Sequence, residues 1–211
     1  MRPKSNLREK ALADRRRFSS KERSRKSRAV AEVFSRLGLL RPGATVGFYL
    51  ATWDEVETRP LVKQAIASDC TVVLPRVALD GELELYQVRD LSSQVEVGSF
   101  GIEEPIRGSK ASLPVELVDC FVVPGVAFDP SGHRLGFGLG YFDRLLARRT
   151  EESLVVALAF ECQIMPAVPA HEHDIFMDII CTEERVIDCR EQSVKPRVVS
   201  QPADGKEVQV P

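Results

Sequence analysis

The 211-residue chain lacks the features that mark membrane proteins, secreted proteins and disulfide-stabilised scaffolds. No apolar run approaches the roughly 20 residues that a helix needs to cross a bilayer, and the first residues lack the apolar core of a secretory signal. The five cysteines are odd in number and contain no CxxC pair, which favours reduced thiols. We therefore expect a soluble, cytoplasmic protein with no membrane partner.

Charge of either sign is common, but it is unevenly distributed. Residues 1–28 carry 12 basic and 3 acidic side chains, which leaves 17 basic and 28 acidic for the rest, so an arm of +9 precedes a body of −11. Such an arm is typical of solvated helices that hold a few phosphates, of an organelle-targeting peptide or of a nucleic-acid-binding segment. Its acids, Glu9, Asp14 and Glu22, disfavour targeting.

Helical and strand patterns alternate along the chain and predict an α/β fold. The S-x-x-E spacing of Ser19 and Glu22 is a capping box for a helix that runs to Gly38. Shorter helices are expected over 6–17, 58–70 and 140–149. Four apolar runs predict buried strands, and alternation predicts an edge strand; these segments are 44–51, 71–75, 119–125, 153–160 and, for the edge, 81–88.

The order of these elements predicts a mostly parallel sheet with right-handed crossovers. Residues 89–114 are rich in Gly, Ser and Pro and are expected to form loops. We expect one domain over residues 1–190, followed by a disordered tail over 191–211, because that tail is polar and aperiodic.

The segment "RLGFGLGYFDR", residues 134–144, places glycine at every second position between a strand and a helix. This context lets backbone N–H groups and a helix N-terminus bind phosphate. It is neither a P-loop nor a GxGxxG turn, since Tyr141 and Asp143 stand where that turn needs glycine. Arg134 and Arg144 add charge for phosphate, and Asp143 adds a carboxylate for a hard cation.

The longer stretch "VVPGVAFDPSGHRLGFGLGYFDRLL" resembles the signature PGxxFDxxGxRLGxGxGYYDR of the 5-formyltetrahydrofolate cyclo-ligases, with Phe142 in place of the second tyrosine. Three further segments, in the order expected for that family, extend the resemblance over most of residues 4–185; they are "KSNLR", "FYLATWDEVET" and "VALAFECQIMPAVPAHEHDIFMD".

The resemblance implies a fold, an activity and a set of ligands. The fold would be a three-layer α/β sandwich similar to the ribose-phosphate isomerase/CoA transferase-like fold. The activity would be the conversion of 5-formyltetrahydrofolate to 5,10-methenyltetrahydrofolate with ATP and Mg²⁺, through phosphorylation of the formyl oxygen and attack by N10. We expect a monomer whose partners are these small molecules, with no nucleic acid.

The resemblance also implies roles for individual residues. Arg134, Tyr141 and Glu55 would be catalytic, Leu50, Glu55 and Tyr141 would contact folate, and Asp143 and Asp174 would hold Mg²⁺. The basic N-terminal helix would fold back to the glycines. ATP would be bound by Lys4, Arg8, Arg134, Leu135, Gly136, Phe137, Gly138, Leu139, Gly140, Tyr141 and Phe142. Because Phe137 and Leu139 carry no charge, Lys4, Arg8, Arg134 and Mg²⁺ must neutralise the γ-phosphate.

Two other functions are open to the sequence. His171, His173 and Asp174 in "HEHD" could hold zinc in a hydrolase, although His133 is the only other histidine and no HExxH motif occurs. The basic arm could bind nucleic acid, although Phe18 is its only aromatic residue and the acidic body would repel a polyanion.

Overall fold

The computed structural model describes residues 2–107, 112–171 and 174–190; the tail expected over 191–211 and His173 lie outside these ranges. The helices are α1 (Arg2–Arg16), α2 (Ser20–Ser35), α3 (Arg59–Ala67) and α4 (Tyr141–Leu146), with 3₁₀ turns η1 (Ser99–Gly101), η2 (Val115–Leu117) and η3 (Glu161–Gln163). The strands are β1 (Thr45–Gly47), β2 (Thr71–Val77), β3 (Leu83–Gln87), β4 (Val95–Val97), β5 (Glu103–Pro105), β6 (Cys120–Val123), β7 (Ala127–Phe128), β8 (Arg134–Leu135), β9 (Leu154–Leu158), β10 (Ile179–Cys181) and β11 (Val186–Asp188).

A seven-stranded sheet in the order β11-β10-β9-β6-β1-β2-β3 forms the centre of the molecule. Its five inner strands run parallel, and the edge strands β3 and β11 pair antiparallel to their neighbours. The expected mostly parallel α/β sheet, with residues 81–88 at its edge, is therefore confirmed. Within the described ranges, no helix is both long and apolar enough to span a membrane.

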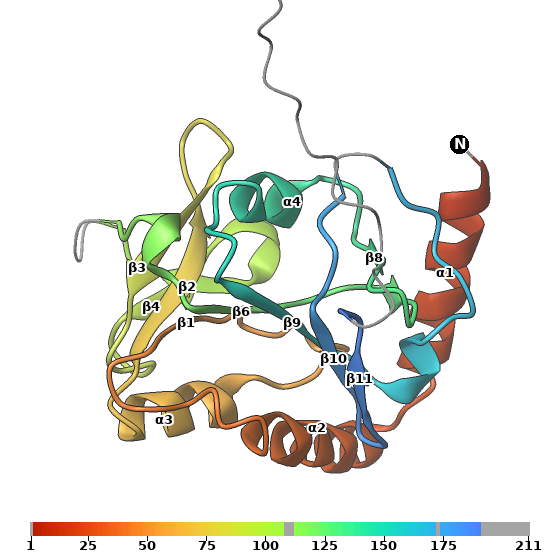
Figure 1. Ribbon diagram of the computed structural model, residues 1–211, viewed down its shortest axis with the longest axis horizontal. Coiled ribbons are helices and arrows are strands. Elements are labelled where there is room, and N and C mark those ends of the chain that lie inside the picture. Colours follow the sequence, from red (N-terminus) through yellow and green to blue (C-terminus); the bar gives the residue numbers. More distant parts are fainter. Residues whose placement is uncertain (1, 108–111, 172–173, 191–211) are drawn as a thin grey trace, which may run out of the picture.

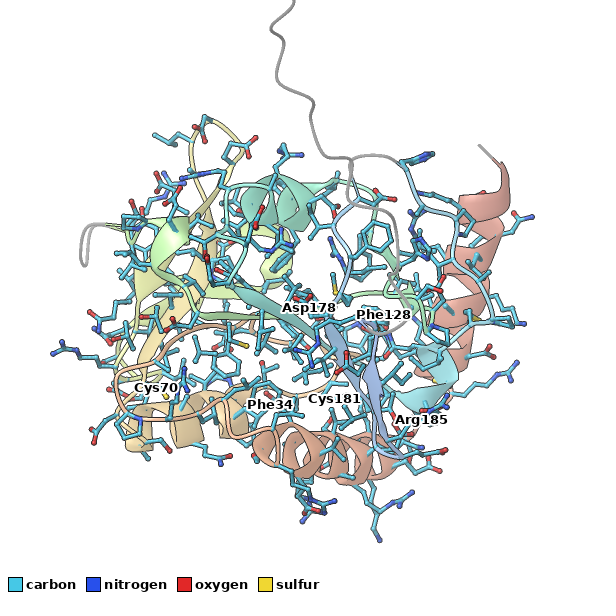
Figure 2. The ribbon with its side chains drawn as sticks, in the orientation of Figure 1. Phe34, Cys70, Phe128, Asp178, Cys181 and Arg185 are labelled. Atoms are coloured by element: carbon cyan, nitrogen blue, oxygen red, sulfur yellow. The ribbon has the colours of Figure 1, made fainter. Side chains whose placement is uncertain are left out.

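Hydrophobic cores lie on both faces of this sheet, because successive side chains of a buried strand point to opposite faces. Val122 of β6 packs in the core under α2 and α3, whereas its neighbour Val123 packs in the core under α4. Figure 1 shows α2 and α3 on one side of the sheet and α4 on the other. Phe34 and Phe128, labelled in Figure 2, belong to these two cores respectively.

Helix α1 stands beside the sheet, at the right of Figure 1. The apolar face of this helix is small: Ala11, with Leu7 and Leu12, packs against a third cluster that includes Val126 and Leu135. The capping box between Ser19 and Glu22 then starts α2, as the sequence predicts. The basic arm is thus a helical pair, and its first helix begins before the expected residue 6.

Several short elements escape the sequence patterns. The predicted strand over 44–51 ends at Gly47, because the chain leaves the ladder after one further hydrogen bond, from Phe48 N to Val73 O. A hairpin of β4 and β5 lies in the expected loop region, and β7 pairs with β8 before the glycines. Strands of two or three residues are too short to show a periodicity.

The strand order reverses between β1 and β6: the chain continues from β1 to β2 in one direction and from β6 to β9 in the other. In open parallel sheets, ligands bind beyond the carboxyl ends of the strands at such a switch point. The segments that follow β1 and β6 at this point begin with Phe48 and Pro124.

Candidate active site

A cavity of about 640 Å³ opens at this switch point, within the usual size range of small-molecule sites. Tyr49 and Leu50 enter it after β1, and Pro124 and Gly125 after β6. Every residue to which the family resemblance assigns a site role lines it; these are Lys4, Arg8, Leu50, Glu55, Arg134, Leu135, Gly136, Phe137, Gly138, Leu139, Gly140, Tyr141, Phe142, Asp143 and Asp174.

The glycine loop, residues 134–142, has backbone that side chains would disturb. Gly138 and Gly140 adopt φ of +102° and +68°, which L-residues rarely accept. A Cβ at Gly136, Gly138 or Gly140 would lie 3.5, 3.4 or 3.1 Å from a guanidinium nitrogen of Arg134, Arg8 or Arg144, respectively. Side chains at Gly138 and Gly140 would therefore be strained, and three guanidinium groups lie close to the loop.

Helix α1 brings two cations to this loop. Arg8 Nε donates to the Gly136 carbonyl at 2.9 Å, and Lys4 Nζ lies 3.1 Å from Asp174 Oδ2. These residues are one helical turn apart and so share a face of α1. The expectation that the basic helix folds back to the glycines is confirmed for Arg8, whereas Lys4 pairs with Asp174 in the same cavity.

Two carboxylates face the same cavity. Asp143 Oδ1 accepts from Arg134 Nη2 at 2.7 Å and from the Ile175 amide at 3.4 Å. Asp174 Oδ2 accepts from the His171 amide at 2.7 Å. Burial raises the pKa of Asp174, but this amide and the Lys4 ammonium outweigh burial and hold the pKa below its ordinary value. Both groups are oxygen donors of the kind that Mg²⁺ prefers.

A second part of the cavity lining, Leu50 with the acidic turn of residues 52–55, is part of the core. Leu50 and Glu55 are only 6% and 7% exposed. The Thr52 amide donates to Glu55 Oε2 at 2.9 Å. Burial raises the pKa of the Glu55 carboxyl above its ordinary 4.5, more than this hydrogen bond and Arg15 lower it.

Aromatic and apolar side chains complete the cavity. Arg144 lies over the Tyr141 ring at 5.3 Å and Arg134 over the Phe142 ring at 5.8 Å, measured to the ring centroids. Phe137 and Leu139 also line the cavity and are more than half exposed. This part of the cavity therefore combines flat aromatic rings with positively charged guanidinium groups.

Arg15, near the site, has no role in the sequence interpretation, and Arg144 has one only as a charge for phosphate. Arg15 is buried behind the cavity wall, and Arg144 joins the Leu139 carbonyl, at 2.9 Å, to Glu82 of the β2–β3 hairpin. The helical spacing of the sequence could have indicated that Arg15 faces the site. At about 100° per residue, Lys4, Arg8 and Arg15 fall within about 40° of one another around a helix.

The described residues form no metal-binding cluster that would support the zinc hypothesis. Within the described ranges, no group of three or more His, Cys, Asp or Glu side chains could hold a metal ion together. His173 lies outside those ranges.

Comparison with known proteins agrees with this geometry. Residues 1–183 match the model of the 5-formyltetrahydrofolate cyclo-ligase family. The 5-formyltetrahydrofolate cyclo-ligase of Mus musculus is 30% identical over 86% of this chain and 94% of its own, and that of Mycolicibacterium smegmatis 30% over 88% and 96%. The solved structure of Aquifex aeolicus 5,10-methenyltetrahydrofolate synthetase is 35% identical, with a TM-score of 0.78, over 98% of this chain and 96% of that one.

Proposed function

The chain belongs to the 5-formyltetrahydrofolate cyclo-ligase family, and from this premise we propose that its cavity binds MgATP and 5-formyltetrahydrofolate side by side and forms 5,10-methenyltetrahydrofolate, ADP and phosphate. One observation carries the proposal. A single cavity is lined both by a glycine loop that guanidinium groups approach and by the buried carboxyl of Glu55.

The reaction needs activation because a formamide is a poor electrophile and its oxygen is a poor leaving group. The formyl oxygen attacks the γ-phosphorus, and the bond from phosphorus to ADP breaks. The folate N10 then attacks the activated carbon, the carbon–oxygen bond breaks, phosphate departs and N10 loses its proton. Phosphoryl transfer of this kind asks a protein mainly for positioning and charge neutralisation.

Lys4, Arg8 and the glycine loop form the nucleotide half of the cavity. The amides of the loop cradle phosphate, and the guanidinium groups of Arg8 and Arg134 supply positive charge from fixed positions. Arg134 is the catalytic contact to the transferred phosphoryl group. Helix α4 has only six residues, so the loop and its cations, rather than a helix dipole, carry this binding.

Asp143 and Asp174 would hold the Mg²⁺ that accompanies ATP. Both residues line the cavity, and Asp143 accepts from the amide of Ile175, the residue after Asp174. Two carboxylates with substrate phosphates and water are the usual protein environment of Mg²⁺. When bound, the ion neutralises charge on the β- and γ-phosphates.

Leu50 and the acidic turn form the folate half of the cavity. Leu50 and Glu55 contact the folate, and Tyr141 lies against it from the glycine loop. Glu55 and Tyr141 are the catalytic contacts on this side. Because Glu55 is buried, it presents its carboxyl to the folate without competition from bulk water.

The test is a coupled assay with the purified protein. We expect 5-formyltetrahydrofolate and MgATP to produce the methenyl chromophore with one ADP for each product formed. Omission of either ATP or Mg²⁺ should abolish the signal. A folded protein that forms no methenyl product with all components present would refute the proposal.

Three further proposals accompany this function. Residues 1–190 form one catalytic domain, which the family match over residues 1–183 supports. The enzyme works in the cytoplasm, for which the odd number of cysteines and the lack of a CxxC pair are the support. It works as a monomer, because the described residues of one chain supply every proposed contact to one cavity.

A further inference from the structure

Arg15 is the most buried charged side chain near the cavity, and the function as proposed gives it no role. Its side chain is 1% exposed at the last turn of α1. Burial of a guanidinium is costly unless the charge is paired and its donors are used. The contacts that offset the cost of burying the Arg15 charge show which segments this residue holds together.

These contacts come from three separate segments. Nη2 donates to Asp54 Oδ1 at 2.9 Å, and Nη1 donates to the Gly125 carbonyl at 3.3 Å. Nη1 also lies 4.0 Å from Glu55 Oε1, and the guanidinium carbon lies 6.0 Å from the centre of the Phe137 ring. The acidic turn, the segment after β6 and the glycine loop therefore meet at one side chain carried by α1.

Arg15 touches both halves of the cavity without lining it. Glu55 belongs to the folate half, Phe137 belongs to the nucleotide half, and α1 also carries Lys4 and Arg8. The Gly125 carbonyl is held in place by a second donor, Gln163 Nε2, at 2.9 Å. Because Arg15 does not line the cavity, it can act on the substrates only through the residues that it positions, such as Glu55 and Phe137.

We propose that Arg15 is a positioning residue that couples the two substrate sites, so that bound folate strengthens nucleotide binding and bound nucleotide strengthens folate binding. The proposal rests on the proposed function. The two effects must be equal in size, because a coupling free energy between two sites is reciprocal. Couplings of this type change an affinity by about 5–150-fold.

The variant Arg15→Lys tests this coupling. Lysine keeps the charge beside Asp54, but its single ammonium lacks the planar fork that reaches Asp54 and the Gly125 carbonyl together. Arg16→Met is the matched control, since Arg16 also pairs with Asp54, at 3.4 Å, but is half exposed. Asp54→Asn is a second test variant that preserves shape and removes the charge that orients the guanidinium.

The measurement is the Kd of Mg²⁺ with AMP-PNP, a non-hydrolysable ATP analogue, by calorimetry with and without saturating 5-formyltetrahydrofolate. We expect folate to tighten binding at least about five-fold in the wild type and in Arg16→Met. In Arg15→Lys and Asp54→Asn, the ratio of the Kd without folate to the Kd with folate should fall toward one. Thermal melts should show that both variants are folded. If Arg15→Lys does not fold, Asp54→Asn decides.

Each outcome separates the two proposals. A wild-type ratio of one in an enzyme that forms the methenyl product overturns the coupling and leaves the function intact. A folded Arg15→Lys or Asp54→Asn that keeps the wild-type ratio also overturns the coupling. A folded wild type that binds neither ligand and forms no product overturns the function itself.

Discussion

The two proposed halves of the cavity, one for folate and one for nucleotide, are built in different ways. The folate half is a wall of the hydrophobic core: Leu50 and Glu55 are 6% and 7% exposed, and Leu50 packs with the residues under α2 and α3. The nucleotide half is a loop held by polar contacts to arginine side chains, with Phe137 and Leu139 52% and 55% exposed.

This difference teaches where function and stability are coupled. A substitution in the folate half changes core packing or a buried charge, so it alters both stability and binding. A substitution among residues 136–140 of the nucleotide half adds bulk at a surface loop, where most changes cost little stability. The nucleotide half can therefore be disabled in a molecule that still folds.

The largest effect should come from Gly138→Val. A valine there must adopt φ of +102°, and its Cβ would lie 3.4 Å from Nη2 of Arg8. We expect turnover to fall roughly 100-fold or more, as after the loss of one donor from an electrostatic cradle. Methenyl formation at saturating ATP measures this loss.

Gly43→Val is its matched control. Gly43 has φ of +83° in the turn before β1, with open space around its Cβ position. Both substitutions strain the backbone by about 1–3 kcal/mol, so both should lower the melting temperature. If Gly43→Val loses as much turnover per folded molecule as Gly138→Val, strain rather than the cradle explains the loss.

Asp143→Asn should have the next largest effect. The amide keeps the shape of the side chain but removes the negative charge beside Arg134. We expect the Mg²⁺ concentration for half-maximal activity to rise on the order of 10–100-fold, as is common for residues around a metal. A magnesium titration of turnover measures it.

The control for this titration is Asp188→Asn, which breaks an exposed aspartate–arginine pair away from the cavity. Its magnesium dependence should match the wild type. An unchanged titration for Asp143→Asn would remove this residue from the proposed metal site.

Arg8→Met should raise the KM for ATP by roughly 10-fold. The substitution removes a charged donor to the Gly136 carbonyl, and a hydrogen bond of this kind contributes about 1.5–3 kcal/mol. The KM for folate should change less, because Arg8 belongs to the other half. Lys10→Met, which removes an exposed charge from the same helix, should leave both constants as they are.

The sequence predicts the two halves unequally well. The buried strands and the edge strand are predictable because apolar runs and alternation report directly on burial. The glycine loop is predictable because its spacing has no use in an ordinary strand or helix. The guanidinium groups that face each glycine are not, since Arg8 comes from a helix 128 residues away.

Arg15 shows the same limit in the folate half. Its charge suggests a solvated position, and only the docking of α1 on the segment after β6 buries it. The paired strands β7 and β8 have two residues each, which is too few to form a sequence pattern. Tertiary contacts, rather than local propensity, place these groups.

The smallest effect that we expect is a gain of stability in Glu55→Gln. Burial raises the pKa of this carboxyl above 4.5, so the folded state favours its neutral form. The stability that the neutral form contributes is complete below the ordinary pKa and is lost as the pH rises through the raised value. Glutamine does not ionise, so it carries no such loss.

The melting temperature of Glu55→Gln should therefore exceed that of the wild type by a few degrees at most near neutral pH, where about 1 kcal/mol corresponds to roughly 2–4 °C in a chain of this size. The difference should shrink as the pH falls toward 4.5. The KM for folate should rise in the same variant. Leu139→Gln, an exposed change in the other half, should show no pH-dependent difference. A Glu55→Gln variant that is less stable at every pH would mean that the contact with Arg15 outweighs burial, and the folate half would then be held by charge, as the nucleotide half is.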